Sequence, residues 1–247
     1  MDPVFIHIFG RPIYWYGVLT ALGFLAAVLH LSWLGKKEGY PAGHASQLGI
    51  WVMVCGILGA RFAYVIANFP EYLSKPLDMV RIDEGGLIYY GGFIGAALGI
   101  IVLAHRKNEP LWRFSDFAIT ALPLGHAIGR IGCFLNGCCF GQACELPWGV
   151  VRGDQNVHPT PLYETAFNLV VYAVLVRHHG KKERDGNVVA LYLILYPIGR
   201  FFFEMTRGDD RTRWLGLTVA QEISIALLLT GCLLWRFLPR SKEPAHG

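Results

Sequence analysis

Charged residues are scarce in this sequence. Only 16% of its 247 residues are Asp, Glu, Lys or Arg, whereas 53% are hydrophobic. A chain this long and this apolar exceeds what one ordinary soluble core buries, which excludes a small soluble domain and indicates a polytopic membrane protein. The net charge of +4 is divided among short basic clusters between apolar segments, so we expect no nucleic-acid partner.

The N-terminal segment lacks the features of a removable leader. Met1 to His7 contains no Lys or Arg, and no small-residue cleavage site precedes the first apolar run. We therefore expect the first apolar segment to stay in the membrane. Internal repeats, low-complexity tracts and a separate soluble domain are also missing, so we expect a single integral membrane domain over residues 1–247.

Long apolar runs are what the sequence has in abundance. A helix of about 17 to 25 apolar residues crosses the hydrocarbon core of a bilayer, which is about 30 Å thick. We therefore expect an all-α fold of about seven transmembrane helices. The apolar segments run approximately over Ile13 to Leu34, Ala45 to Ala67, Leu87 to His105, Phe114 to Leu135, Leu162 to Arg177, Asn187 to Phe203 and Leu217 to Phe237.

Basic residues between these segments are unevenly divided between the two sides. Cytoplasmic loops carry the excess of Lys and Arg, which predicts an N-terminus outside and a C-terminus in the cytoplasm. The outward stretch 137–161 is expected to form a small cap. Twelve basic residues fall on the expected inside (Lys36, Lys37, Arg106, Lys107, Arg113, Arg177, Lys181, Lys182, Arg184, Arg236, Arg240, Lys242) and seven outside (Arg11, Lys75, Arg81, Arg152, Arg207, Arg211, Arg213).

Three arginines, Arg61, Arg130 and Arg200, lie within the apolar segments themselves. A charge at the centre of a membrane helix costs roughly 2.5 to 3.5 kcal/mol, so it usually faces a polar cavity and a partner. Arginine does not lose its proton, which favours permanent anion binding or ion pairing. Snorkelling to the interface is the structural alternative.

Two of these arginines have informative neighbours. Gly125, Gly129 and Gly132 remove side chains beside Arg130, which permits close approach of a backbone or a ligand. Arg200 shares a helix face with Tyr196 and Glu204, because these lie four residues before and after it. We expect Glu204 to offset part of the charge of Arg200.

Four of the six cysteines, Cys133, Cys138, Cys139 and Cys144, fall close together near the expected outer face. A disulfide between Cys144 and Cys138 or Cys139 is compatible with an oxidising compartment. The spacing is not a CxxC pair and the nearby histidines lie on separate elements, so no zinc site is expected. No cofactor is expected either.

The polar motifs of the chain resemble those of the prolipoprotein diacylglyceryl transferase family. The family signature Gly-Arg-x-Gly-Asn-Phe-x-Asn-x-Glu-x-x-Gly matches residues 129–141, where the glycines, Arg130, Phe134 and Asn136 are kept. The resemblance extends to further motifs in the same order: Trp15-Tyr16-Gly17, Gly59-Ala60-Arg61, the loop from Gly85-Gly86 to Gly91-Gly92, His158 to Glu164, and Tyr196 through Arg200 to Arg207, ending near Gln221.

The chain departs from the family pattern at three places. Cys133 and Cys138 stand where asparagine and glutamate are frequent, and Tyr90 stands where relatives carry a histidine suspected of acting as a base. Histidine titrates near pH 6.5 and tyrosine near 10, so the identity of the base cannot be carried over.

The resemblance implies transfer of the diacylglyceryl group of phosphatidylglycerol to the lipobox cysteine of a prolipoprotein signal peptide, in the cytoplasmic (inner) membrane. A thioether would form, and glycerol phosphate would leave. Catalytic roles would then fall to Arg130, Arg200, Glu204 and Tyr90. Substrate binding would involve Arg130, Tyr16, Asn136, Tyr196 and Arg61, with membrane lipid as a partner. For Tyr16, Asn136 and Tyr196, interfacial packing or interhelical hydrogen bonding is the structural alternative.

Two other classes of function fit parts of the pattern. An anion or lipid transporter would also bury arginines along its path, although the two halves show no repeat. A membrane thiol-disulfide enzyme would need a reactive pair among the outer cysteines.

Overall fold

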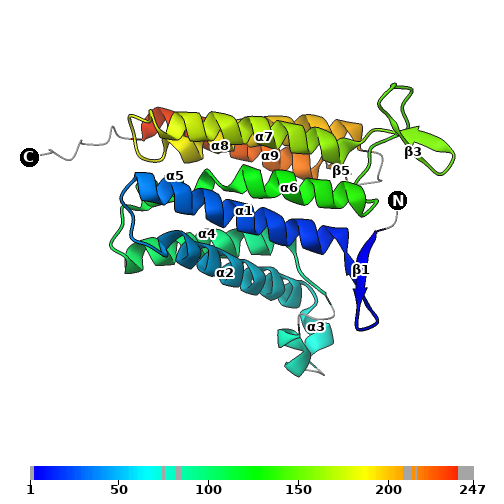
Figure 1. Cartoon of the computed structure of the whole chain (residues 1–247), viewed down its shortest axis with the longest axis horizontal. Coiled ribbons are helices and arrows are strands. Elements are labelled where there is room, and N and C mark those ends of the chain that lie inside the picture. Colours follow the sequence, from blue (N-terminus) through cyan, green and yellow to red (C-terminus); the bar gives the residue numbers. More distant parts are fainter. Residues whose placement is uncertain (1–2, 74–75, 82–84, 208–212, 215, 239–247) are drawn as a thin grey trace, which may run out of the picture. The chain divides into compact units, whose positions relative to one another are not determined.

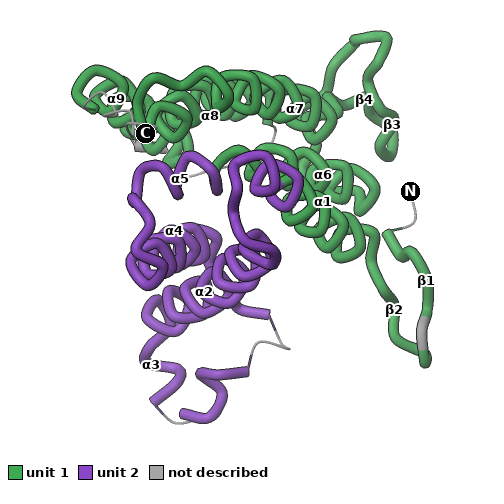
Figure 2. The backbone as a smooth tube through the Cα atoms, turned by 60° about the vertical axis from the view of Figure 1, so that its left-hand side comes forward, with its two compact units in different colours: residues 1–30, 119–247 green, residues 31–118 purple. Residues whose placement is uncertain are grey.

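A computed structural model describes residues 3–73, 76–81, 85–207, 213–214 and 216–238 of the chain. The helices and strands fall into two compact units, coloured separately in Figure 2. The first unit comprises residues 1–30 and 119–247, and the second comprises residues 31–118. The C-terminal residues 239–247, which are predicted to lie in the cytoplasm, are outside the described residues.

The first unit holds most of the long helices. In Figure 1, α7, α8 and α9 run alongside one another, with short hairpins at one end. Its elements are β1 (Val4–Ile8), β2 (Arg11–Tyr14), the first part of α1 (Trp15–Lys37), α6 (Leu122–Leu135), β3 (Val150–Arg152), β4 (Gln155–Val157), α7 (Thr160–His179), α8 (Asn187–Thr206), β5 (Arg213–Trp214), β6 (Leu217–Thr218) and α9 (Val219–Phe237).

The second unit is built around two helices packed against each other. Its elements are the end of α1, α2 (His44–Ala67), α3 (Phe69–Tyr72), the short 3-10 helix η1 (Pro76–Val80), α4 (Tyr89–Arg106) and most of α5 (Leu111–Ile119).

Each predicted apolar segment is mainly helical, although the first begins in β2 and the last in β6. This confirms an all-α, polytopic membrane fold. Six helical stretches in the described chain are long and apolar enough to cross a membrane. The seventh predicted segment is helical as α7 but is not among them, because its apolar character is weaker. The fourth segment is divided between α5 and α6 near Thr120, where Pro123 opens the second helix.

Glycines permit the closest helix contact in the second unit. A Cβ atom at Gly59 would lie within 3 Å of the backbone of α4, and one at Gly95 would meet the carbonyl oxygen of Cys55 in α2. Gly91 faces Gly59 from the first turn of α4. Backbones therefore touch where no side chain intervenes.

Glycines also permit close contact between helices in the first unit. A Cβ atom at Gly23 of α1 would lie 2.7 Å from the carbonyl oxygen of Gly125 in α6. Gly231 of α9 meets the backbone of α8 near Leu193, while Val171 and Tyr192 contribute to a buried core between α7 and α8. These contacts set the spacing of the helices that carry the site.

The predicted outward cap contains a small antiparallel hairpin of β3 and β4 that turns at Gly153, where φ is 59°. Backbone hydrogen bonds tie the cap to the end of α8, because Gln142 donates to the carbonyl of Thr206 at 2.9 Å. The cap thus covers the end of the first unit at which α6 and α8 terminate and α7 begins.

Candidate functional site

Helix α6 ends in a defined turn just beyond the central arginine. The N–H of Gly137 donates to the carbonyl of Phe134, and the N–H of Cys138 donates to that of Cys133, each at 3.1 Å. Gly137 has a φ of 72°. This pair of bonds around a left-handed glycine is the Schellman motif, which satisfies carbonyls at the helix end.

Arg130 lies inside α6 and is mostly buried, with 17% of its side chain exposed. Its Nε lies 2.7 Å from Oε2 of Glu164 in α7 and also donates to Nε2 of His126 at 3.2 Å. Within the described chain, the two Nη groups have no hydrogen-bond partner. The arginine is therefore held at Nε, while the terminal fork is available to an anion.

Arg200 forms the ion pair predicted from its sequence spacing. Its Nη1 lies 2.8 Å from Oε2 of Glu204, one turn later in α8. The other carboxylate oxygen of Glu204 accepts a hydrogen bond from Oγ1 of Thr218 at 3.1 Å. Thr218 also caps α9 through a reciprocal capping box with Gln221. The start of α9 thus orients the carboxylate that holds Arg200.

The two ion pairs belong to one electrostatic cluster. Glu164 interacts with Arg200 and Arg207 as well as with Arg130, and His126 lies near both Arg130 and Arg200. The cluster therefore gathers three arginines around buried carboxylates at one end of the first unit. Such a concentration of positive charge in a water-poor region suits a phosphate group.

The other predicted residues of the first unit lie around this cluster. The ring of Tyr196 in α8 is 5.6 Å from that of His126, and Asn136 is the C-terminal cap of α6, where its buried Oδ1 accepts no hydrogen bond from the described residues. Tyr16 is half exposed, and its backbone packs against Gly132. Gly129 has open space where a side chain would be.

Arg61 and Tyr90, the remaining predicted residues, belong to the second unit. The buried guanidinium of Arg61 donates to four backbone carbonyls, at 2.5 to 3.1 Å, and so ties α2 to the segment before α4. Gly85 and Gly86 in that segment have φ values of 85° and 73°, in the left-handed region that favours glycine. Tyr90 lies in the first turn of α4 with 46% of its surface exposed.

Sequence reasoning missed the partners of Arg130. Glu164 was recognised only as part of a motif, and His126 was not considered as a contact of the arginine. The available signal was a carboxylate within an apolar segment, which implies a buried cation nearby. Spacing along a helix could not identify this pair, because Glu164 belongs to a different helix.

All six cysteines lie among the described residues, and each is a free thiol. The disulfide considered for Cys144 is therefore not formed in this structure.

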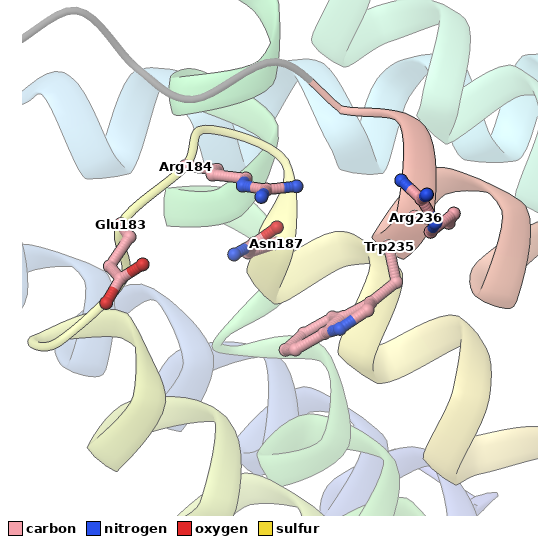
Figure 3. Close-up of a pocket in the computed structure, with 5 residues that line it drawn as sticks. All are labelled: Glu183, Arg184, Asn187, Trp235 and Arg236. Atoms are coloured by element: carbon pink, nitrogen blue, oxygen red, sulfur yellow. The ribbon is translucent and has the colours of Figure 1, made fainter.

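A cavity of about 290 Å³ lies elsewhere in the first unit (Figure 3). It lies between the beginning of α8 and the end of α9, roughly 20 Å along α8 from Arg200 at 1.5 Å per residue. None of the predicted site residues lines it, so we do not assign the reaction to this cavity. Its lining consists of Glu183, Arg184, Asn187, Trp235 and Arg236.

Comparison with known proteins finds one family along almost the whole chain. The family model described as prolipoprotein diacylglyceryl transferase matches residues 3–237. A relative from Clostridium tetani is 34% identical over 95% of this chain and 97% of its own length. One from Finegoldia magna is 36% identical over 95% and 94%, and one from Synechocystis is 33% identical over 98% and 92%.

All three relatives carry the name phosphatidylglycerol–prolipoprotein diacylglyceryl transferase. These matches support the transferase interpretation and not the transporter alternative. With its membrane-spanning helices and this match over almost its whole length, the chain belongs to the prolipoprotein diacylglyceryl transferase family and is a multi-pass membrane transferase.

Proposed function

We propose that this protein transfers the diacylglyceryl group of phosphatidylglycerol to the cysteine thiol of a prolipoprotein lipobox. The names of its relatives, which cover almost the whole chain, supply both substrates. The observation that carries the proposal here is Arg130, which is anchored at Nε by Glu164 while its Nη groups lack partners among the described residues. A phosphodiester oxygen pair matches that fork.

The reaction exchanges one bond at a glycerol carbon for another. The substrate sulfur forms a carbon–sulfur bond as the carbon–oxygen bond to the phosphate breaks, so glycerol phosphate leaves with the bonding electrons. The thiol proton passes to water or to the departing phosphate. Charge grows on the leaving group, and fixed cations placed at that point stabilise it more than they stabilise the substrate.

Within this scheme Arg130 and Arg200 bind the phosphate, and Glu204 orients Arg200. Glu164 takes the matching role for Arg130. A free thiol has a pKa of about 8.5, and neighbouring guanidinium groups favour its thiolate form. Tyr16, Asn136 and Tyr196 are proposed to hydrogen-bond the glycerol head group, which fits the partnerless Oδ1 of Asn136 in the described chain.

For the second unit we propose a hydrogen bond from Tyr90 to the substrate. Arg61 is proposed to act by positioning the segment that leads into α4, because four of its N–H groups already bind backbone carbonyls. Its contribution to substrate binding is then indirect.

We also propose that the protein resides in the cytoplasmic membrane with its N-terminus outside and its C-terminus inside. The uneven distribution of basic residues supports this orientation. The cap and the arginine cluster would then face the side on which a secreted precursor arrives.

Transfer is tested with the purified chain in vesicles that contain phosphatidylglycerol, using a synthetic lipobox peptide. Mass spectrometry should find the peptide with one added diacylglyceryl group in thioether linkage. A peptide with serine in place of cysteine should remain unmodified, because a hydroxyl is a much weaker nucleophile than a thiolate. The Clostridium tetani relative serves as a positive control: product from that protein and none from this chain would refute the proposal.

A further inference from the structure

The turn that ends α6 brings three cysteines together. In a Schellman motif the side chain of the second residue past the cap meets that of the third residue from the helix end. Here these positions are Cys138 and Cys133, and the Cys138 thiol lies 3.4 Å from the Cys133 carbonyl oxygen. The motif usually joins two apolar side chains, whereas in this chain it joins two thiols.

A second unusual backbone conformation adds the third thiol. Cys139 has a φ of 64°, in the left-handed region that residues other than glycine seldom adopt. Its Sγ lies 3.5 Å from that of Cys138, and all three sulfurs lie within 4.8 Å of one another. Tetrahedral zinc with bonds of about 2.3 Å to sulfur requires sulfurs roughly 3.8 Å apart. The observed spacing is close to that requirement.

Two arginines lie close to the cluster. Arg130 acts electrostatically on all three thiols, and Arg207 acts on that of Cys139. Three thiolates around a divalent cation carry a net charge of −1, and the positive charges of these arginines lie near it. Cys133 is buried and its two partners are half-buried, so the cluster is shielded but can be reached from outside.

From this geometry we propose that Cys133, Cys138 and Cys139 form a three-thiolate site for a thiophilic d10 metal ion such as Zn²⁺ or Cu⁺. Soft sulfur ligands select these ions over Mg²⁺ and Ca²⁺. The sequence spacing argued against such a site because the thiols do not form a CxxC pair. However, the left-handed conformations of Gly137 and Cys139 turn the chain so that the three thiols lie close together despite that spacing.

The test compares two chains that each keep three cysteines. The first retains Cys133, Cys138 and Cys139 and has serine at positions 55, 144 and 232. The second retains the cysteines at positions 55, 144 and 232 and has serine at positions 133, 138 and 139. Both are purified without oxygen in a phosphine reductant and titrated with Zn²⁺ against a coloured chelator, with Cu⁺ and Mg²⁺ in separate arms. Cd²⁺ reports thiolate ligation through its ultraviolet charge-transfer band.

The first chain should bind one Zn²⁺ or Cu⁺ per molecule and should not bind Mg²⁺. With Cd²⁺ it should show the thiolate charge-transfer band. In that chain, Cys139→Ser should weaken binding by more than the roughly 10- to 100-fold that loss of an outer-shell partner causes. Equal binding by both chains, or no thiolate band in the first, would overturn the proposal.

Lipid transfer is a separate measurement on the same proteins. The attacking sulfur belongs to the substrate, so the second chain, with serine at positions 133, 138 and 139, should keep measurable transfer and thereby prove folded. Loss of transfer in a chain that is still folded would instead favour a thiol-dependent enzyme. Absence of transfer in the wild-type protein as well as in both chains, with metal bound only by the first, would refute the proposed function and leave the metal site supported.

Discussion

At the scale of single residues, the shape of the guanidinium matters as much as its charge. Arg130→Lys and Arg200→Lys keep the positive charge but lose the planar fork that can donate two parallel hydrogen bonds to a phosphate. We expect each variant to lower kcat/KM for lipid transfer by roughly 100-fold or more, as loss of a transition-state donor does. The measurement is the rate of thioether formation at limiting phosphatidylglycerol.

Arg152→Lys is a matched control, because Arg152 is exposed on the cap hairpin. It should leave the rate unchanged. A wild-type rate for Arg130→Lys would mean that charge compensation of Glu164 is sufficient and that no bidentate contact is made.

Tyr90 offers a second test at this scale. A phenol with an ordinary pKa near 10 is a poor base at neutral pH, so we attribute a hydrogen bond to it rather than proton removal. Tyr90→Phe should slow transfer by roughly 10- to 100-fold, the effect of one hydrogen bond made to a charged group. Tyr90→His should retain activity, since relatives are expected to carry histidine at this position.

The two roles of Tyr90 differ in their dependence on pH. Rates of the wild type and both variants are compared from about pH 6 to 9, around the reference pKa values of histidine and cysteine. Complete inactivity of Tyr90→Phe at every pH, beside a wild-type rate that rises with one ionisation, would make Tyr90 the base.

At the scale of helices, close contact between backbones is a source of stability that substitution can probe. Gly95→Ala places a Cβ atom against the carbonyl of Cys55 and forces α2 and α4 apart. Overpacking of this kind typically costs about 1 to 3 kcal/mol. Gly17→Ala in α1 meets nothing within 4 Å and should be neutral or stabilising by up to about 1 kcal/mol, as alanine is the better helix former.

Unfolding of both variants in detergent micelles, followed by circular dichroism, checks this prediction. Equal stability of the two would show that α2 and α4 separate at little cost. The two variants can be compared directly because both substitutions add the same methyl group to a helical glycine.

The helices were predictable because an apolar segment in lipid must satisfy its own backbone hydrogen bonds, which leaves a helix as the natural solution. Three features escaped prediction for physical reasons. The break between α5 and α6 depends on a single proline, Pro123. The hairpins depend on left-handed turns such as that at Gly153. The Arg130–Glu164 pair depends on how two helices pack against each other. The Arg200–Glu204 pair, by contrast, follows from helical spacing alone.

At the scale of the whole molecule, the orientation in the membrane is open to direct test. Single cysteines are introduced at Val151 on the cap and at Lys181 after α7, in a background without other reactive thiols. Both positions are exposed, whereas the neighbouring His179 is buried and would not report reliably. An impermeant maleimide on intact cells should label position 151 and should reach position 181 only after permeabilisation.

Labelling at position 181 from outside would reverse the orientation and with it the side from which precursors reach the arginine cluster. Lack of labelling at position 151 before permeabilisation would have the same meaning.

The hydrogen bonds of Arg61 affect which positions of the segment before α4 can change in sequence. All four acceptors are main-chain carbonyls, from Asp78, Met79, Gly85 and Gly86, and any amino acid supplies a carbonyl. Positions 78 and 79 are therefore free to drift in sequence without loss of the anchor. Gly86 is not, since a Cβ atom there would lie 2.7 Å from the Nη1 of Arg61. Gly85 is also constrained, because its φ of 85° is one that other residues seldom adopt. The segment can therefore diverge between species while the arginine and the two glycines stay the same.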